Sequence, residues 1–196
     1  MSRLSLREAI KSLESLGIVS AQHGQGIFVR AFSFDPILEN LPYGMGTGDK
    51  LLFELHQVRE ALEEGLLGMV MDRIVPHDLE ELGQIVTEME ARVSRGAPFT
   101  ELDRQFHRRM FLGLDNRLVL RLIDLFWETY HRLEGQVIPE EPDPDHAVAL
   151  HKAVVEALGS GDRSRALAAL TDHFGSSRSR IAAALALSSR GSGTVR

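Results

Sequence analysis

Apolar residues recur every three or four positions along most of the chain, and this spacing is typical of helices with one buried face. Between residues 50 and 188 the pattern is interrupted only by short segments rich in proline, glycine, aspartate or asparagine. Pro76 ends the first predicted helix, and His77 or Asp78 caps the next. The helices predicted for this region span about 50–74, 78–95, 100–114, 117–135, 145–158 and 162–188. Residues 138–145 are expected to be a loop rich in proline and acidic residues, and Asp162 is expected to cap the last helix. Six helices with short connections predict an all-α fold, an antiparallel six-helix bundle.

The first thirty residues follow a different pattern. Residues 4–16 have the spacing of an amphipathic helix, which Gly17 ends, and 18–21 and 27–30 are typical of two short strands. The glycines of residues 22–26 suit the tight turn of a hairpin. A helix followed by a small hairpin is the second half of a winged helix-turn-helix. Residues 1–31 are therefore expected to be a partial winged helix-turn-helix, which a glycine-rich linker, residues 32–49, joins to the bundle.

Composition and charge narrow the class of protein. With 43% hydrophobic and 26% charged residues, the chain has the composition of an ordinary globular protein, and no apolar run reaches the length of a membrane span. A cytoplasmic location and no membrane partner are expected. The absence of cysteine excludes disulfides and thiolate ligands, so any metal must be bound by histidine and carboxylate side chains. The net charge of -6 divides into +2 for residues 1–30 and -8 for the remainder, which predicts an anionic partner for the basic segment alone.

Four residues of the bundle are candidate ligands of a divalent metal. Asp103 and His107 are four positions apart, so they share one face of a helix and can bind one cation together. His151 and His173 each lie on the apolar stripe of a later helix, which predicts that both point inward. Two alternatives remain open from the pattern alone. Asp103 can form a capping box with Thr100, and a histidine on an apolar stripe is more often a hydrogen-bonded core residue than a ligand.

Further candidates concern the binding of a small molecule. Arg59 lies beside the apolar stripe of its helix and can clamp a carboxylate, or it can form a surface ion pair with Glu63 one turn later. Asn116 can donate a hydrogen bond to a ligand or cap the fourth helix of the bundle. His131 and Tyr130 lie near the inward face of that helix.

The N-terminal segment resembles the end of a GntR-type DNA-binding domain. The residues that carry the resemblance are 2–10 (SRLSLREAI), 13–19 (LESLGIV) and 23–29 (HGQGIFV). In that family this helix enters the major groove and the hairpin is the wing, and about two further helices precede them. The resemblance implies operator DNA as a partner, with base or phosphate contacts from Arg3 and Arg7 and backbone or minor-groove contacts from His23 and Gly24.

The remainder resembles the FCD domain, the effector-sensing half of the FadR subfamily of GntR regulators. The matching pieces are 54–63 (ELHQVREALE), Asp103 with His107, Asn116, 150–162 (LHKAVVEALGSGD) and 172–174 (DHF). The resemblance implies an FCD-like domain over residues 50–188. The polar residues 189–196 are expected to be a disordered tail, and paired DNA half-sites predict a homodimer. The resemblance implies that Asp103, His107, His151 and His173 bind a divalent metal such as zinc, nickel or manganese. It also implies a small carboxylic-acid effector near Arg59 and Asn116, and His131 is a further candidate because it lies near the inward face of its helix.

These patterns leave three hypotheses for function. The first is a transcriptional regulator in which a metal and a small organic acid bind the bundle and modulate operator binding. The second is a truncated effector-sensing module that does not bind DNA. The third is a metal-dependent enzyme acting on a small acid, with Glu60 or Glu134 as base. The chain lacks an HExxH pattern, a nucleophile elbow and a phosphate loop, so we expect a protein that is not an enzyme.

Overall fold

The computed structural model describes residues 2–31, 36, 49–133 and 142–191, with side chains for all of these except 49–50, 129–133 and 187–191. The chain divides into two compact units, residues 1–46 and 47–196, which we describe separately. Most of the predicted linker and tail, and part of the predicted loop between 138 and 145, lie outside the described residues. None of the described helices is long and apolar enough to cross a membrane.

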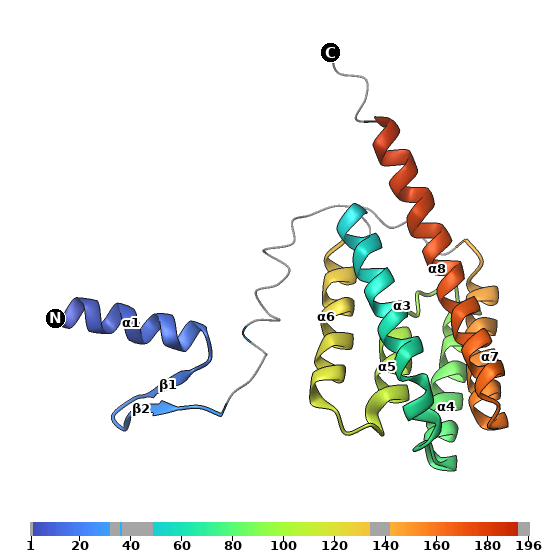
Figure 1. Ribbon diagram of the computed structural model, residues 1–196. Coiled ribbons are helices and arrows are strands. Elements are labelled where there is room, and N and C mark those ends of the chain that lie inside the picture. Colours follow the sequence, from blue (N-terminus) through green and yellow to red (C-terminus); the bar gives the residue numbers. More distant parts are fainter. Residues whose placement is uncertain (1, 32–35, 37–48, 134–141, 192–196) are drawn as a thin grey trace. The chain divides into compact units, whose positions relative to one another are not determined.

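The first unit is a helix followed by a hairpin, which we call the helix–hairpin unit. Its elements are α1 (Arg3–Ser15), β1 (Val19–Gln22) and β2 (Gly26–Val29) (Figure 1). The Ser2 hydroxyl oxygen accepts a hydrogen bond from the Ser5 backbone N–H at 3.0 Å, which begins α1 with an N-cap. The strands pair antiparallel, with Val19 opposite Val29. Gly24 has φ +72° in the turn, a conformation that glycine adopts without strain. The predicted helix and hairpin are confirmed, with each boundary shifted by one residue.

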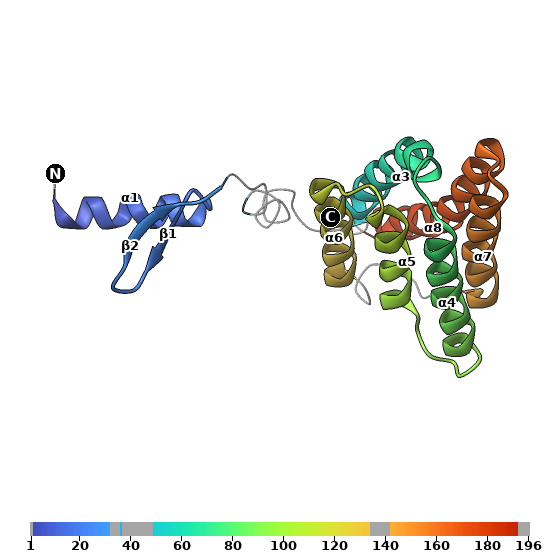
Figure 2. The same cartoon turned by 90° about the horizontal axis from the view of Figure 1, so that it is seen from below.

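The described residues of the second unit form six helices, which we call the bundle. They pack in a closed ring, in the order α3, α8, α7, α4, α5, α6 and back to α3 (Figure 2). Their bounds are α3 (Asp49–Met71), α4 (Pro76–Val93), α5 (Thr100–Leu112), α6 (Arg117–Leu133), α7 (Pro144–Ser160) and α8 (Arg163–Gly191). The all-α fold class and the predicted six helices of this region are confirmed among the described residues. Because the ring is closed, side chains from helices far apart in sequence can meet at its centre.

Several predicted helix boundaries differ from the structure by one to three residues, and the segment before α4 shows the reason most clearly. The first bundle helix ends at Met71 rather than at Pro76, and Pro76 is instead the first residue of α4. Proline suits that position because the N–H it lacks has no partner in the first turn of a helix. Neither His77 nor Asp78 is the N-cap: the Asp78 carboxylate accepts from the backbone N–H of Val75, at 3.0 Å.

The helix predicted from residue 100 does begin at Thr100, but the alternative capping box between Thr100 and Asp103 is not formed, because Phe99 is the N-cap of α5 and makes no side-chain capping bond. The last helix extends beyond the predicted end at 188 to Gly191. Asp162 does cap it as predicted, accepting hydrogen bonds from the backbone N–H groups of Ser164 and Arg165 at 2.9 and 3.1 Å.

The bundle has one main apolar core, built from the inward faces of all six helices. Phe106, Phe111 and Trp127 are almost completely buried in it, together with Phe174 of α8. A smaller cluster of Leu51, Leu55 and Phe126 joins the beginning of α3 to α6. A group of buried polar residues lies beside the main core, and it contains the candidate ligands.

Candidate metal centre and effector cavity

The four predicted ligands meet inside the bundle, although they come from three helices. Asp103 and His107 lie one turn apart on α5, His151 lies on α7 and His173 on α8. Each offers one ligand atom, and these atoms all lie within 4.8 Å of one another. His107 and His151 are buried, and the other two are partly buried. The structure thus brings together every residue of the predicted metal site.

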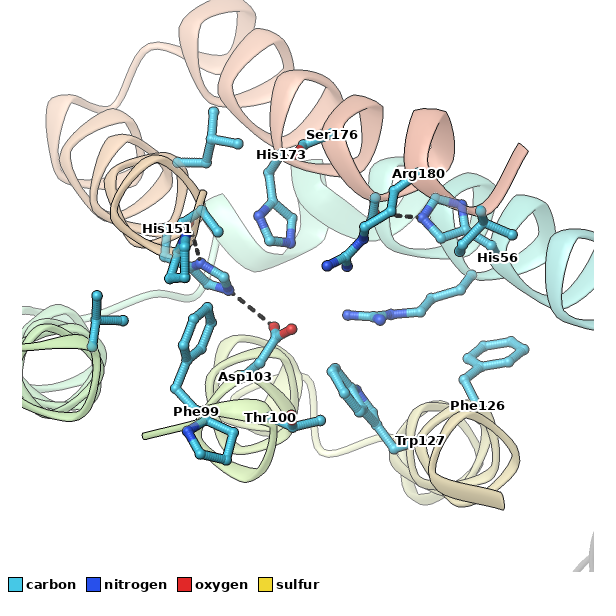
Figure 3. A pocket seen from close by; sticks show the side chains of 18 of the residues that line it. His56, Phe99, Thr100, Asp103, Phe126, Trp127, His151, His173, Ser176 and Arg180 are labelled. Atoms are coloured by element: carbon cyan, nitrogen blue, oxygen red, sulfur yellow. Dashed lines mark hydrogen bonds and ion pairs between the residues drawn. The ribbon is translucent and has the colours of Figure 1, made fainter. Parts of the chain in front are cut away.

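The hydrogen bonds of His151 determine which of its ring nitrogens can bind a cation. Its Nδ1 lies 2.8 Å from the carbonyl oxygen of Ala147, which can only accept, so Nδ1 carries the proton and donates. In the neutral ring Nε2 then has a free lone pair, and it lies 2.9 Å from Oδ1 of Asp103 (Figure 3). Two acceptor atoms therefore face each other, an arrangement that requires a positive charge.

His107 repeats this arrangement on the opposite side. Its Nδ1 lies 2.5 Å from Oε2 of the buried Glu63, so Nδ1 is the donor and Nε2 carries the lone pair. That Nε2 lies 3.0 Å from Nε2 of His173 and 3.2 Å from Oδ1 of Asp103. Three imidazole nitrogens and one carboxylate oxygen thus converge as acceptors. This donor set fits a divalent cation, and a carboxylate or carbonyl behind a ligating histidine is the usual second layer of such sites.

The charges around the site hold its carboxylates in the ionised form. Burial opposes ionisation of Asp103, but the adjacent His151 and His107 outweigh burial and hold its pKa well below the ordinary value. Glu63 is also fully buried, and His107 and Arg59 together hold its pKa below the ordinary value in spite of burial. Both carboxylates are therefore anions at neutral pH.

The histidines differ in their electrostatic surroundings. Burial, reinforced by the neighbouring His151 and His107, holds the pKa of His173 well below the ordinary value, so this ring is neutral and ready to act as a ligand. Burial and Arg59 lower the pKa of His107, but Glu63 and Asp103 outweigh them and raise it. The positively charged form of His107 is therefore favoured by the two carboxylates that flank its ring.

A cavity of about 530 Å³ opens beside the candidate ligands, between α3, α5, α6, α7 and α8. Asp103, His151 and His173 line it, and Figure 3 shows Arg180 of α8 directed toward the same space. Its volume lies in the range of small-molecule sites in proteins. The cavity can thus hold a ligand that reaches the candidate metal centre directly.

Arg59 of α3 also lines this cavity, as predicted. Its Nε donates to Oε1 of Glu63 at 2.8 Å, so the alternative ion pair is also formed, although it is buried rather than on the surface. The guanidinium lies 4.7 Å from the Trp127 ring centre and 5.2 Å from that of Phe174. These contacts fix the side chain, and its Nη2 is buried without a hydrogen-bond partner. A fixed guanidinium with a free donor is suited to bind a carboxylate.

Among the described side chains, one predicted effector residue, Asn116, does not join this group. Asn116 is exposed and caps α6, since its side-chain oxygen accepts from the backbone N–H groups of Leu118 and Val119 at 3.1 and 3.3 Å. This is the capping alternative, so we leave Asn116 out of the effector site. The side chains of His131 and Tyr130 lie outside the described residues.

Sequence reasoning missed two polar residues of the site. Arg180 could have been found from its spacing, because His173, Ser177 and Arg180 follow one another at positions i, i+4 and i+7 of one helix face. Glu63 was identified only as the partner of Arg59. Its second role, as the acceptor behind His107, depends on a contact between α3 and α5 that no local pattern indicates.

The predicted DNA-binding residues all lie at the surface of the helix–hairpin unit. Arg3 and Arg7 are exposed on α1, four positions apart and therefore on one face. His23 and Gly24 are exposed in the turn of the hairpin. Each of these residues is accessible to a partner.

Comparison with known proteins agrees with this architecture. The sequence profile of the FCD domain matches residues 54–176. The HTH-type transcriptional regulator YcbG of Bacillus subtilis is 26% identical over 183 residues, covering 92% of this chain and 75% of YcbG. LutR, an HTH-type transcriptional regulator of the same organism, is 23% identical over 179 residues, covering 89% of this chain and 82% of LutR. The solved structure of Streptococcus agalactiae GntR has a TM-score of 0.66 and 24% identity, covering 91% of this chain and 82% of that one.

The profile match extends from α3 into α8, and it includes all four candidate ligands and Arg59. It therefore covers more than half of the chain and the whole of the candidate metal centre. The alignments with YcbG and LutR cover 92% and 89% of this chain, so they extend beyond the part that the profile matches. The chain belongs to the FCD-domain family of GntR-type transcriptional regulators.

Proposed function

We propose that this regulator senses a small carboxylic acid through a divalent metal held by Asp103, His107, His151 and His173. The helix–hairpin unit contacts operator DNA, and the chain acts as a homodimer. The observation that carries the proposal is the convergence of acceptor atoms in the bundle. His107 Nε2 and His151 Nε2 both face Asp103 Oδ1, and the opposite nitrogen of each ring is already fixed as a donor.

The metal prepares the cavity for an acid. A bound divalent cation supplies positive charge and coordination positions that a carboxylate oxygen can fill. Arg59 offers a free N–H donor next to this position, since Nη2 lacks a partner while Glu63 holds Nε. Arg180 adds a second cationic side chain in the same cavity. An acid is favoured over a neutral ligand because a carboxylate satisfies both the cation and the guanidinium groups.

The positions of these residues explain how binding can alter the arrangement of the helices. The four ligands come from α5, α7 and α8, and Arg59 comes from α3. An acid that bridges the metal and Arg59 therefore favours arrangements in which these helices are close together. Because a ligand shifts an equilibrium only through its different affinities for the two states, contacts to several helices are what regulation requires.

The surface of the helix–hairpin unit supports a role in DNA binding. Arg3 and Arg7 lie on one exposed face of α1, and residues 1–30 carry a net charge of +2 in a chain of net charge -6. Arginine binds phosphates and guanine edges through paired hydrogen bonds. The named relatives YcbG and LutR are HTH-type transcriptional regulators. A dimer would place two such units on paired half-sites.

Metal binding is tested by measuring the metal content of the purified protein. The double variant His107→Ala/His173→Ala removes two of the four ligands, so we expect it to lose the metal that the unchanged protein carries. His146→Ala, which removes an exposed histidine at the beginning of α7, serves as the control and should keep the metal. Unchanged metal content in the double variant would refute the site.

The regulatory role is tested by titrating a panel of hydroxy, keto and sugar acids against the metal-loaded protein. Binding without a product supports a sensor, and reproducible turnover would overturn the proposal in favour of an enzyme. Gel-shift experiments with operator DNA then compare the unchanged chain with Arg3→Ala/Arg7→Ala. We expect the double variant to bind more weakly and with a smaller dependence on salt, because it makes fewer phosphate contacts. Equal binding by both proteins would exclude α1 as the DNA-contacting helix.

A further inference from the structure

The cavity has a polar end and an apolar end. The polar end contains the candidate metal ligands, Arg59 and Arg180. The apolar end, as we call it, consists of lining residues from α3, α6 and α8, namely Leu52, Leu55, Phe126, Trp127 and Ile181. Figure 3 shows Trp127 and Phe126 on α6, with Phe126 farther from His151 and Asp103 than Trp127 is. A ligand whose carboxylate is at the metal therefore extends its body toward an apolar wall.

The pairing of α3 with α8 explains how the apolar end is formed. The contacts of Glu64 with Thr171 and of His56 with Ser177 show that the two helices run antiparallel, and Glu60 with Arg178 adds a third contact between them. One turn farther in the same direction, this order brings Leu52 of α3 opposite Ile181 of α8. Both side chains are buried at this position, 3% and 1% exposed, and both line the cavity.

Near this apolar end, His56 and Ser177 already form a hydrogen bond with each other, while the second ring nitrogen of His56, Nδ1, is buried without a hydrogen-bond partner. His56 Nε2 and the Ser177 hydroxyl lie 2.6 Å apart, and that hydroxyl also lies 3.1 Å from the carbonyl oxygen of Phe174. His56 is neutral, because burial, Arg59 and Arg178 lower its pKa to about 4. A ligand hydroxyl placed against Leu52, Phe126 and Ile181 would lose its hydrogen bonds to water and contact apolar side chains instead. Burying a hydroxyl without a hydrogen-bond partner weakens binding, whereas burying an apolar group strengthens it.

We infer that the effector is a carboxylic acid with an apolar body, aliphatic or aromatic, rather than a polyhydroxylated sugar acid. This inference rests on the proposed function and narrows it to one class of ligand. The carboxylate binds at the metal beside Arg59 and Arg180, and the body packs against Leu52, Phe126 and Ile181. The apolar end thus determines which acids are recognised, while the polar end accepts any carboxylate.

The test uses acids that share one 2-hydroxycarboxylate head and differ only in the body. Lactate has a methyl group, 2-hydroxy-4-methylpentanoate has a branched aliphatic body, 3-phenyllactate has an aromatic body and gluconate has a polyhydroxylated body. Trp127 is the single tryptophan of the chain and lines the cavity, so its fluorescence reports binding to metal-loaded protein. We expect the aliphatic and aromatic acids to bind at least about tenfold more tightly than lactate, and gluconate no more tightly than lactate.

A variant of the apolar end provides a second readout. Leu52→Asn places an amide on the wall, so we expect 3-phenyllactate to lose about tenfold in affinity while lactate changes little. Leu52→Ala makes a milder change and should lose a few-fold, which keeps the test informative where the asparagine variant does not fold. Val58→Asn is the control, because Val58 lies on the same helix, is exposed and does not line the cavity.

Three results would overturn the inference, and each has a different consequence. Gluconate binding more tightly than the apolar acids would refute the apolar body while leaving the proposed sensor intact. If the protein contains its metal and no acid of the series binds, the carboxylic-acid sensor itself is wrong and the inference fails with it. Equal affinity of all four acids, unaffected by Leu52→Asn, would show that the body does not contact the apolar end.

Discussion

The helix–hairpin unit and the bundle both contain regularly spaced apolar residues, but these residues are mostly exposed in the first and buried in the second. In the helix–hairpin unit, none of the residues of α1 is buried, and Leu4, Ile27 and Phe28 remain 68%, 50% and 45% exposed. In the bundle, Phe111 and Phe174 are at most 1% exposed. Periodicity therefore predicts that an amphipathic element forms, but a core requires partner elements that cover the apolar face.

Polar residues show the reverse contrast. Arg3, Arg7 and Glu8 of α1 are exposed, whereas Glu63, His107 and His151 are buried in the bundle. Burying a charged or polar group is unfavourable unless the protein supplies its partners. In the bundle, these partners come from neighbouring helices. Because burying polar side chains costs free energy, we expect such a cluster mainly where it binds a ligand. Buried polar residues are thus the better indicator of the functional site.

The largest expected difference between the two units is the loss of stability when one phenylalanine of each is replaced by alanine. Phe111→Ala should lower the free energy of unfolding of the bundle by about 3–5 kcal/mol, because it leaves a cavity in a close-packed core. Phe28→Ala should lower that of the helix–hairpin unit by no more than about 1 kcal/mol, since nearly half of the side chain is already in water. Chemical denaturation measures both. Equal losses would show that the exposed face of the hairpin is covered in solution.

The second comparison concerns a buried and an exposed glutamate. Glu63→Leu removes the acceptor of both Arg59 Nε and His107 Nδ1, so we expect the bundle to lose about 3 kcal/mol or more. Glu8→Leu removes an exposed pair with Lys11 at 3.8 Å, and a loss below about 0.5 kcal/mol is expected. The melting temperatures of both variants provide the measurement. A Glu63→Leu variant as stable as the unchanged protein would show that the buried network contributes nothing to the bundle.

A third prediction concerns pH and one buried histidine. Burial, together with Arg59 and Arg178, lowers the pKa of His56 from 6.5 to about 4. Arg180 lowers this pKa as well, and the smaller opposite effect of Glu63 does not offset these contributions. Between these values the unfolded chain binds more protons than the folded one, so stability decreases as the pH falls from 6.5 toward 4. The loss from this group between pH 7.5 and 5 should be about 2 kcal/mol.

The variant His56→Gln isolates this contribution. It removes the titrating ring, so its stability should depend less on pH between 4 and 6.5 than that of the unchanged protein. His146→Gln, which removes an exposed histidine of α7, is the matched control and should retain the full dependence. Identical pH profiles for all three proteins would contradict the neutral, buried state of His56.

The smallest expected effects come from the helix caps of the two units. Asn116→Ala removes the N-cap of α6 and should reduce the stability of the bundle by about 1 kcal/mol, without changing the affinity for an acid. Ser2→Ala removes the N-cap of α1 and should reduce the helix content of the helix–hairpin unit without affecting the bundle. Denaturation, circular dichroism and acid titration measure these outcomes. Weaker acid binding by Asn116→Ala would restore this residue to the effector site.

Features that depend on residues close together in the sequence were predicted, whereas features that depend on contacts between distant residues were not. The helices and the hairpin were predicted because their signals are local: apolar spacing, the glycines of residues 22–26 and the cap at Asp162. The error at Pro76 is also instructive, since a proline suits the first turn of a new helix as well as the end of an old one. Local patterns thus give the elements and leave some of their boundaries undecided.

The candidate ligands were identified for a similar reason. His151 and His173 interrupt apolar stripes, and Asp103 and His107 share a face, so each points inward when its helix packs. The roles of Glu63 and Arg180 beside the candidate ligands were not predicted, because they depend on contacts between helices that are far apart in the sequence. Glu63 meets His107 across 44 positions of the chain, and the pairing of α3 with α8 determines what Arg180 faces.

The ring of helices also constrains the order in which the protein can assemble during synthesis. The ring closes where α3, its first helix, meets α8, its last, and the His56–Ser177 contact spans 121 positions. His173 lies on that same last helix, so the nascent chain holds only three of the four ligands until α8 has left the ribosome. Closing so long a loop has a high entropic cost that only the completed contacts offset. Metal capture in the cell is therefore expected to follow translation of α8 and to report that the bundle is complete.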